Sequence, residues 1–154
     1  MSAHGAVVEW KRGDQPFVNK RYSRAHIWTF DGGATVRASS APESVPLPMS
    51  DASAVDPEEA MIASLSSCHM LWFLAFAANA GLILDSYRDQ ASGELDRDEA
   101  GKRYLARVTL RPVTAFTGRQ PDQAELDALH HQAHDHCEMA HSVRAAITVE
   151  ASIG

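Results

Sequence analysis

Residues 56–81, DPEEAMIASLSSCHMLWFLAFAANAG, carry the signals of a long helix. Asp56 can cap the first free amides, Pro57 has its φ preset for the first turn, and two glutamates follow that complement the helix dipole. Gly81 provides a stop. The side chains between are apolar or small all round, which predicts burial on every side. A chain of 154 residues can hardly enclose such a helix alone, so we expect a homodimer.

Strand patterns lie on both sides of this helix. Asp31-Gly32-Gly33 is a hairpin turn, because glycines accept positive φ. Residues 40–54 carry three prolines and predict an irregular but ordered loop. We expect strands at residues 6–10, 22–30, 34–39, 83–94, 102–112 and 143–153. The order indicates a single α+β domain, residues 1–154, with antiparallel sheets around two central helices.

The second helix is predicted to begin at Pro121 and Asp122. Its apolar positions repeat at helical spacing, which predicts one buried stripe formed by Leu126, Leu129, Ala133 and Cys137. Cys137 is therefore expected on a helix and facing the core.

Charge and composition exclude several classes of function. The net charge is −6 and the 14 basic residues are scattered, which argues against binding to nucleic acid. No secretory leader is visible, and the most apolar segment, residues 70–78, is too short to span a bilayer. We therefore expect a soluble cytoplasmic protein that does not bind a membrane.

Two cysteines, Cys68 and Cys137, are candidate redox groups. In a reducing compartment such a pair is more often functional, or simply buried, than a structural disulfide. One interpretation is that both are small buried hydrophobic residues. The other is a redox pair, in which one thiolate attacks a peroxide oxygen, becomes a sulfenic acid and is resolved by the second thiol. This chemistry needs a nearby cation or donor, because only the thiolate is nucleophilic.

Several motifs resemble the OsmC/Ohr family of thiol-dependent hydroperoxide reductases. The long helix is similar to the family's central helix in DPEEA at 56–60, SSC at 66–68 and LWFL at 71–74. The family's reactive cysteine lies ten residues after the glutamate of an Asn-Pro-Glu-like motif, which is the spacing of Glu58 and Cys68. The second family cysteine follows Ala-His, matched by AHDHC at 133–137. The strand order also agrees.

The resemblance implies an OsmC-like fold, an intertwined homodimer and reduction of organic hydroperoxides. Cys68 would attack the peroxide, Cys137 would resolve the sulfenic acid, and a dithiol, such as a lipoyl protein, would reduce the disulfide. Glu58 would pair with an arginine that lowers the Cys68 pKa. No cofactor and no metal are implied. In a straight helix Glu58 and Cys68 lie roughly 15 Å apart, so either the helix breaks near Glu58 or two chains assemble the site.

The sequence departs from the family pattern in two places. Cys137 is followed by Glu138 where the family usually has proline. Neither position at which the family carries its arginine has one here, and the nearest candidates are Arg24 and Arg37. We favour Arg24, which on a strand would share one face with Tyr22, His26 and Trp28.

Five histidines crowd the second helix region, and His69 follows Cys68. His130 and His134, at i and i+4, have a spacing that can hold a metal, but a solvated helix face fits better. His69 or His136 could assist proton transfer near a thiol. Two non-redox alternatives remain: a small-molecule binding or stress-response protein without turnover, and a cysteine hydrolase, for which no local signature exists.

Overall fold

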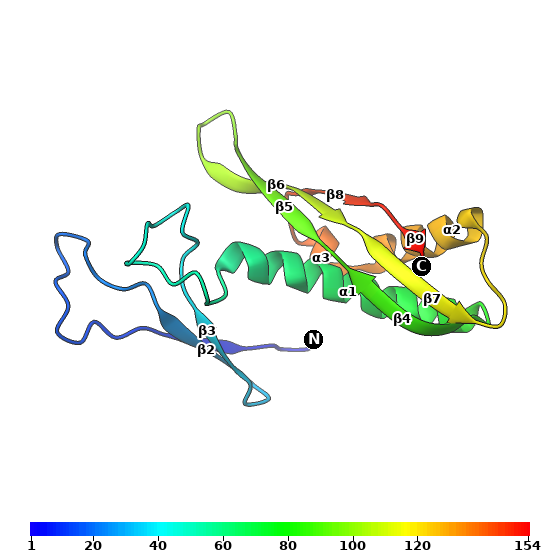
Figure 1. The fold of residues 1–154 in the computed structure, drawn as a ribbon, viewed down its shortest axis with the longest axis horizontal. Coiled ribbons are helices and arrows are strands. Elements are labelled where there is room, and N and C mark those ends of the chain that lie inside the picture. The colour runs from blue at the N-terminus through cyan, green and yellow to red at the C-terminus, as the bar shows by residue number, and fades with distance from the viewer. The chain divides into compact units, whose positions relative to one another are not determined.

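The computed structural model describes residues 1–154, which form two compact units, residues 1–60 and 61–154 (Figure 1). The first unit is an antiparallel sheet of β1 (Ala6–Glu9), β2 (His26–Phe30) and β3 (Thr35–Ala38), in that order. The predicted hairpin joins β2 to β3, and Gly33 has φ +85° there. The predicted strand at 22–30 was too long, because β2 begins at His26. Residues 40–54 contain no helix or strand, as expected.

The long helix is confirmed as α1 (Pro57–Asn79). Asp56 Oδ1 accepts a hydrogen bond from the backbone N–H of Glu59 at 2.8 Å, and the Glu59 carboxylate accepts one from Asp56 N–H at 3.1 Å. This reciprocal capping box satisfies two free amides at the helix start. Gly81, with φ +73°, follows the helix end. The helix is unbroken, so the break near Glu58 that we considered is wrong.

Only one stripe of α1 is covered within the chain. Its buried residues are Leu65, His69, Phe73 and Ala77, each four positions after the last. Other apolar side chains of the helix remain exposed, such as Leu71 at 60% and Met61 at 43%. The expected burial on every side is therefore not achieved by a single chain.

By length and composition alone, α1 is also apolar enough to cross a membrane. A single helix of this kind is weak evidence, because the core helix of a soluble protein passes the same test. The expectation that no segment spans a membrane stays a prediction.

The second unit contains two three-stranded sheets. One has the order β4 (Ile83–Asp89), β7 (Pro112–Thr117) and β9 (Ser152–Ile153), and the other β5 (Ser92–Arg97), β6 (Arg103–Leu110) and β8 (Ala146–Val149). The predicted strands at 83–94, 102–112 and 143–153 are each divided, because the chain passes from one sheet to the other. At one such passage the Asp89 carboxylate accepts a hydrogen bond from Arg111 N–H at 2.6 Å.

The prediction of purely antiparallel sheets was wrong for the C-terminal strands. β8 pairs with β6, and β9 with β7, in parallel. Parallel neighbours need a long crossover connection, and α2 (Gln123–His136) with α3 (Glu138–His141) supplies it. The fold is α+β with mixed sheets.

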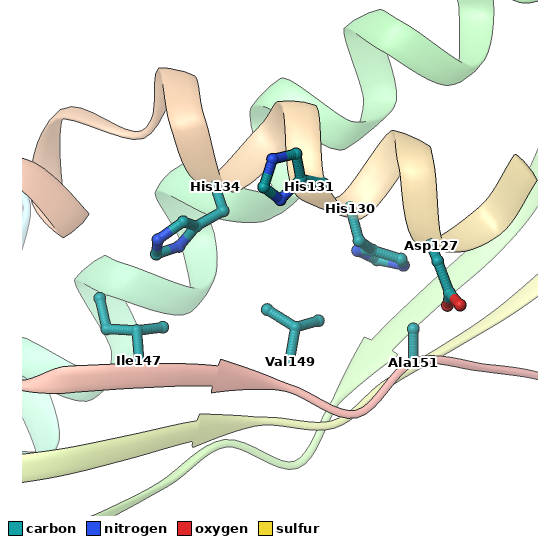
Figure 2. A pocket seen from close by; sticks show the side chains of 7 residues that line it. All are labelled: Asp127, His130, His131, His134, Ile147, Val149 and Ala151. Atoms are coloured by element: carbon teal, nitrogen blue, oxygen red, sulfur yellow. The ribbon is translucent and has the colours of Figure 1, made fainter. Parts of the chain in front are cut away.

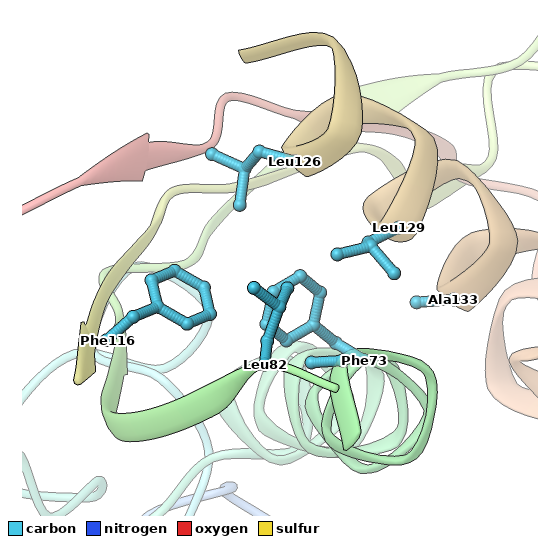
Figure 3. Close-up of a cluster of buried hydrophobic side chains, with 7 residues drawn as sticks. Phe73, Leu82, Phe116, Leu126, Leu129 and Ala133 are labelled. Carbon is cyan, nitrogen blue, oxygen red and sulfur yellow. The ribbon is translucent and has the colours of Figure 1, made fainter. Parts of the chain in front are cut away.

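The core of the second unit lies where α1, α2 and the sheet containing β4 and β7 meet (Figure 3). Side chains far apart in sequence form one apolar cluster: Phe73, Ala77, Leu82, Phe116, Leu126, Leu129 and Ala133. A smaller cluster joins Leu65 of α1 to Val108 and Leu110 of β6. These contacts fix α1 against α2, and with them the positions of Cys68 and the end of α2.

Candidate functional site

Cys68 and Cys137 both lie in the second unit. Cys68 is on α1, beside the buried stripe, and is half-buried. Cys137 is 1% exposed, which confirms its predicted burial. It lies at the junction of α2 and α3 with φ −72° and ψ 107°, so its predicted helical conformation was wrong. Its Sγ caps α3 by accepting a hydrogen bond from Ala140 N–H at 3.4 Å.

The fold brings the two thiols together from positions 69 residues apart. Cys68 Sγ donates to Glu138 Oε2 at 3.5 Å, and Glu138 directly follows Cys137. The same oxygen accepts a hydrogen bond from Trp72 Nε1 at 3.1 Å. The Cys137 thiol lies close enough to Cys68 to raise the Cys68 pKa. Both cysteines are free thiols.

These surroundings favour the thiol form of Cys68 over the thiolate. Burial of its side chain is the largest cause that raises its pKa, Cys137 raises it further, and the hydrogen bond to Glu138 adds the smallest contribution. A hydrogen bond to the Met139 backbone opposes them, and the pKa is raised to about 11. Only the thiolate attacks a peroxide. The second unit thus brings the sulfur atoms together but leaves Cys68 unactivated.

Glu138 is the site residue that sequence reasoning missed. Its position next to Cys137 was noticed only as a departure from the family's proline. In the structure its carboxylate accepts hydrogen bonds from both Cys68 and Trp72. The hydrogen bond from Trp72 is the main cause that lowers the pKa of Glu138. A carboxylate directly after the second cysteine was the available signal.

Arg24 lies in the first unit, in the segment before β2, so the expectation that it lies on a strand was wrong. Its guanidinium stacks over the Tyr22 ring, 3.8 Å from the centroid, and donates to the carbonyl oxygens of Lys20, at 2.8 Å, and of Tyr22. It lines an apolar cleft of about 490 Å³ together with Val8, Trp10, Phe17, Tyr22, His26, Ser39, Ser40 and Pro57. Trp28 does not line this cleft.

Glu58 is half-buried at the start of α1, also in the first unit. The other candidate arginine, Arg37, is held by Asp51 in an ion pair of 2.5 Å. Arg24 therefore has no carboxylate partner within the first unit, whereas Arg37 is paired with Asp51. The roles of Arg24 and Glu58 in activating Cys68 stay predictions.

The histidines do not converge in the way that a metal site requires, since no three His, Cys, Asp or Glu side chains form a suitable group. His130 Nδ1 instead lies 2.9 Å from Nε2 of the buried His69. His130, His131 and His134 line a pocket of about 350 Å³ between α2 and the C-terminal strands (Figure 2). Asp127, Ile147, Val149 and Ala151 complete its wall.

Residues 50–152 match the family model described as OsmC-like protein. An OsmC-like protein of unknown function from Vibrio cholerae is 45% identical, with a TM-score of 0.96 over 99% of this chain and 100% of that one. No curated protein matches this chain.

Two organic hydroperoxide resistance proteins share the fold. The one from Elizabethkingia anophelis is 17% identical, with a TM-score of 0.72 over 100% of this chain and 96% of that one. The one from Bacillus subtilis is 18% identical, with a TM-score of 0.64 over 99% and 98%. The family match and the Vibrio cholerae relative agree with the fold described above. This chain therefore belongs to the OsmC-like protein family.

Proposed function

We propose that this protein reduces organic hydroperoxides with the Cys68 and Cys137 thiols. The observation that carries the proposal is their juxtaposition: a half-buried thiol on α1 and a buried thiol at the end of α2, both beside Glu138. Two cysteines that served only as core residues would need no carboxylate hydrogen-bonded to one of them.

In the proposed reaction the Cys68 thiolate attacks the outer oxygen of the peroxide. The O–O bond breaks, the alcohol leaves with a proton, and Cys68 becomes a sulfenic acid. The Cys137 thiolate then attacks the Cys68 sulfur, and water leaves as the disulfide forms. A dithiol reductant restores both thiols by exchange and is itself oxidised to a disulfide.

Activation of Cys68 requires a cation, because its pKa is raised where it stands. Arg24 and Glu58 are the proposed activating pair, and Arg24 is the candidate arginine without a carboxylate partner of its own. The unbroken α1 keeps Glu58 roughly 15 Å from Cys68 along one helix. Assembly of the site by two chains is therefore the arrangement that we propose.

A homodimer is the second part of the proposal. The apolar side chains that α1 leaves exposed, Met61, Leu71 and Leu74 among them, support it. Light scattering should give twice the chain mass of 16.8 kDa. We expect Leu71→Asp to give the single-chain mass, while Lys102→Asp in the polar turn leaves the dimer intact. A wild-type protein of 16.8 kDa would contradict the proposal.

Turnover tests the proposed activity. Wild-type protein should consume cumene hydroperoxide continuously with dihydrolipoamide as reductant. Cys68→Ser should be inactive, and Cys137→Ser should lose turnover with the dithiol because its sulfenic acid is not converted to an internal disulfide. Equal consumption by wild type and Cys68→Ser would refute the proposal.

A binding protein without turnover is the second candidate. The raised Cys68 pKa and the apolar cleft around Tyr22 and Arg24 favour it. If it is correct, cumyl alcohol should bind with the same affinity to wild type and to Cys68→Ser, and neither should consume peroxide. Isothermal titration beside the turnover assay distinguishes the two functions.

A further inference from the structure

Three rings of the second unit form a cluster where α1 meets the end of α2. Trp72 and Phe76 lie four residues apart on α1, and His136 is the last residue of α2. The centroid of the Trp72 ring lies 5.7 Å from that of Phe76 and 5.2 Å from that of His136. The Phe76 and His136 rings are 5.1 Å apart. Such separations are typical of offset-stacked and edge-to-face pairs. We call these three rings the aromatic ledge.

The aromatic ledge adjoins the Cys68 thiol. Cys68 precedes Trp72 by four residues on α1, so the two side chains lie on the same face of the helix, one turn apart. One carboxylate oxygen, Glu138 Oε2, accepts hydrogen bonds from both, 3.5 Å from Cys68 Sγ and 3.1 Å from Trp72 Nε1. A group attached to the atom that Cys68 attacks therefore lies within reach of the indole ring.

The rings of the ledge are held in place and are partly accessible. Trp72 and Phe76 pack against the apolar core and are half-buried, whereas His136 is exposed. The Trp72 indole is fixed by its hydrogen bond to Glu138, and His136 Nδ1 donates to the carbonyl oxygen of Gln132 at 2.9 Å. Rings that are already ordered lose little entropy when a ligand stacks on them. The ledge is thus a preformed surface for a planar group.

The charge beside the ledge restricts what it can bind. The Glu138 carboxylate contacts both Trp72 and Cys68, so it repels an anionic group that approaches the thiol. The ledge itself offers π faces and ring edges, which attract another ring beyond the gain from buried apolar area. A neutral molecule with an aryl group next to its reactive atom matches both features.

We propose that the aromatic ledge binds the aryl group of neutral hydroperoxides, and that Trp72 gives the protein a preference for aryl-bearing over purely alkyl hydroperoxides. This inference rests on the proposed function, because it names the substrate class of the Cys68 site. The outer peroxide oxygen then faces Cys68 Sγ while the aryl group stacks on Trp72. The first unit has other rings, in the cleft lined by Trp10, Phe17 and Tyr22, and binding of the aryl group there is the alternative that the test distinguishes.

The first test measures binding at the ledge without peroxide. Reduced full-length protein is alkylated with N-phenylmaleimide or N-cyclohexylmaleimide, whose rings are similar in size but differ in having a π face. In both reactions the Cys68 sulfur adds to the maleimide double bond and the neighbouring carbon takes up a proton. The ratio of the two rates, divided by the same ratio for glutathione, should be about three to ten in wild type. Cys68→Ser measures any reaction at Cys137, which is subtracted.

Substitutions in the ledge should change this normalised ratio. Trp72→Leu should bring it close to one. Trp72→Phe keeps a ring but not the N–H that binds Glu138, so it should retain most of the ratio, which separates stacking from an effect on the carboxylate. His136→Ala, at an exposed position, should lower the ratio by a smaller factor and tests the proposal if Trp72→Leu does not fold. Trp28→Leu, on β2, is the matched control and should keep the wild-type ratio.

Two results of the maleimide experiment would overturn the proposal. One is a normalised ratio near one in wild type, or one that is equal in wild type and Trp72→Leu. The other is a ratio that falls in Tyr22→Leu but not in Trp72→Leu, which would assign the aryl group to the cleft of the first unit.

The second test uses a matched pair of substrates. Cumene hydroperoxide differs from tert-butyl hydroperoxide by a phenyl group in place of one methyl group. The ratio of their kcat/KM values should be about three- to tenfold lower in Trp72→Leu than in wild type, and unchanged in Trp28→Leu. An equal ratio in wild type and Trp72→Leu would overturn the role of the ledge and leave the proposed function intact. A protein that consumes neither hydroperoxide would refute the proposed function, whereas the maleimide ratio would still decide whether the ledge binds an aryl group.

Discussion

The two units of the chain differ in what they bury and in the chemistry they carry. In the first unit Ala38 is the only buried hydrophobic residue, whereas the second contains both apolar clusters. The first unit presents a cation and an aromatic cleft but no thiol. The second holds both thiols, and the pKa of Cys68 there is raised. Sheets of three short strands need a packed face to be stable, so the first unit depends on cover that its own residues do not provide.

The largest expected effect tests the difference in packing. Phe73→Ala removes a fully buried ring from the core of the second unit and should lower the free energy of unfolding by about 3–5 kcal/mol. Val7→Ala, at a residue 61% exposed in the first unit, should change it by less than about 0.5 kcal/mol. Urea titrations at one protein concentration measure both. Equal losses would remove the contrast between the units.

The next effect tests whether the first unit supplies the cation. Arg24→Ala should slow the reaction of Cys68 with cumene hydroperoxide about 100-fold, because less of the thiol is ionised. Arg24→Lys should recover part of the rate, since it keeps the charge but not the guanidinium fork. Stopped-flow loss of free thiol gives the rate constants. Arg37→Ala is the control, and a larger effect there would assign the activating role to Arg37.

Acid should weaken the second unit through its buried histidines. The unfolded chain binds protons at His69 and His130 below about pH 6.5, whereas the folded state binds them only near pH 4 and pH 3. Stability is therefore lost as the pH falls below 6.5, by roughly 2 kcal/mol per histidine at pH 5. Urea titrations between pH 7 and pH 5 should show this slope. The exposed His131→Gln should keep the slope and His130→Gln should reduce it; a flat wild-type profile would contradict it.

The smallest effect tests the carboxylate beside Cys68. Glu138→Gln weakens the hydrogen-bond acceptor that raises the Cys68 pKa, so the pKa should fall and alkylation by iodoacetamide near neutral pH should become a few-fold faster. The effect is limited, because burial is the larger cause and persists. Glu150→Gln, whose carboxylate pairs with Arg111, should leave the rate unchanged. Slower alkylation of Glu138→Gln would assign Glu138 the opposite role.

Local signals predicted α1, its cap and the β2–β3 hairpin, because those depend on residues close in sequence. The burial of Cys137 followed from helical spacing. The divided strands and the parallel pairs escaped prediction, since they depend on where the chain changes sheets, for instance at Arg111. The same limit applies to the site. Glu138 and the His69–His130 pair are formed by contacts across more than 60 residues, which no local pattern encodes.

The proposed reaction depends on Cys68 and Cys137 acting as a redox pair. Intact mass after one equivalent of cumene hydroperoxide, measured on wild type, Cys68→Ser and Cys137→Ser, tests this pairing. We predict that wild type loses about 2 Da as the disulfide forms, Cys137→Ser gains about 16 Da as a sulfenic acid, and Cys68→Ser does not change. Slow oxidation that is alike in all three proteins would contradict the claim and favour the binding protein.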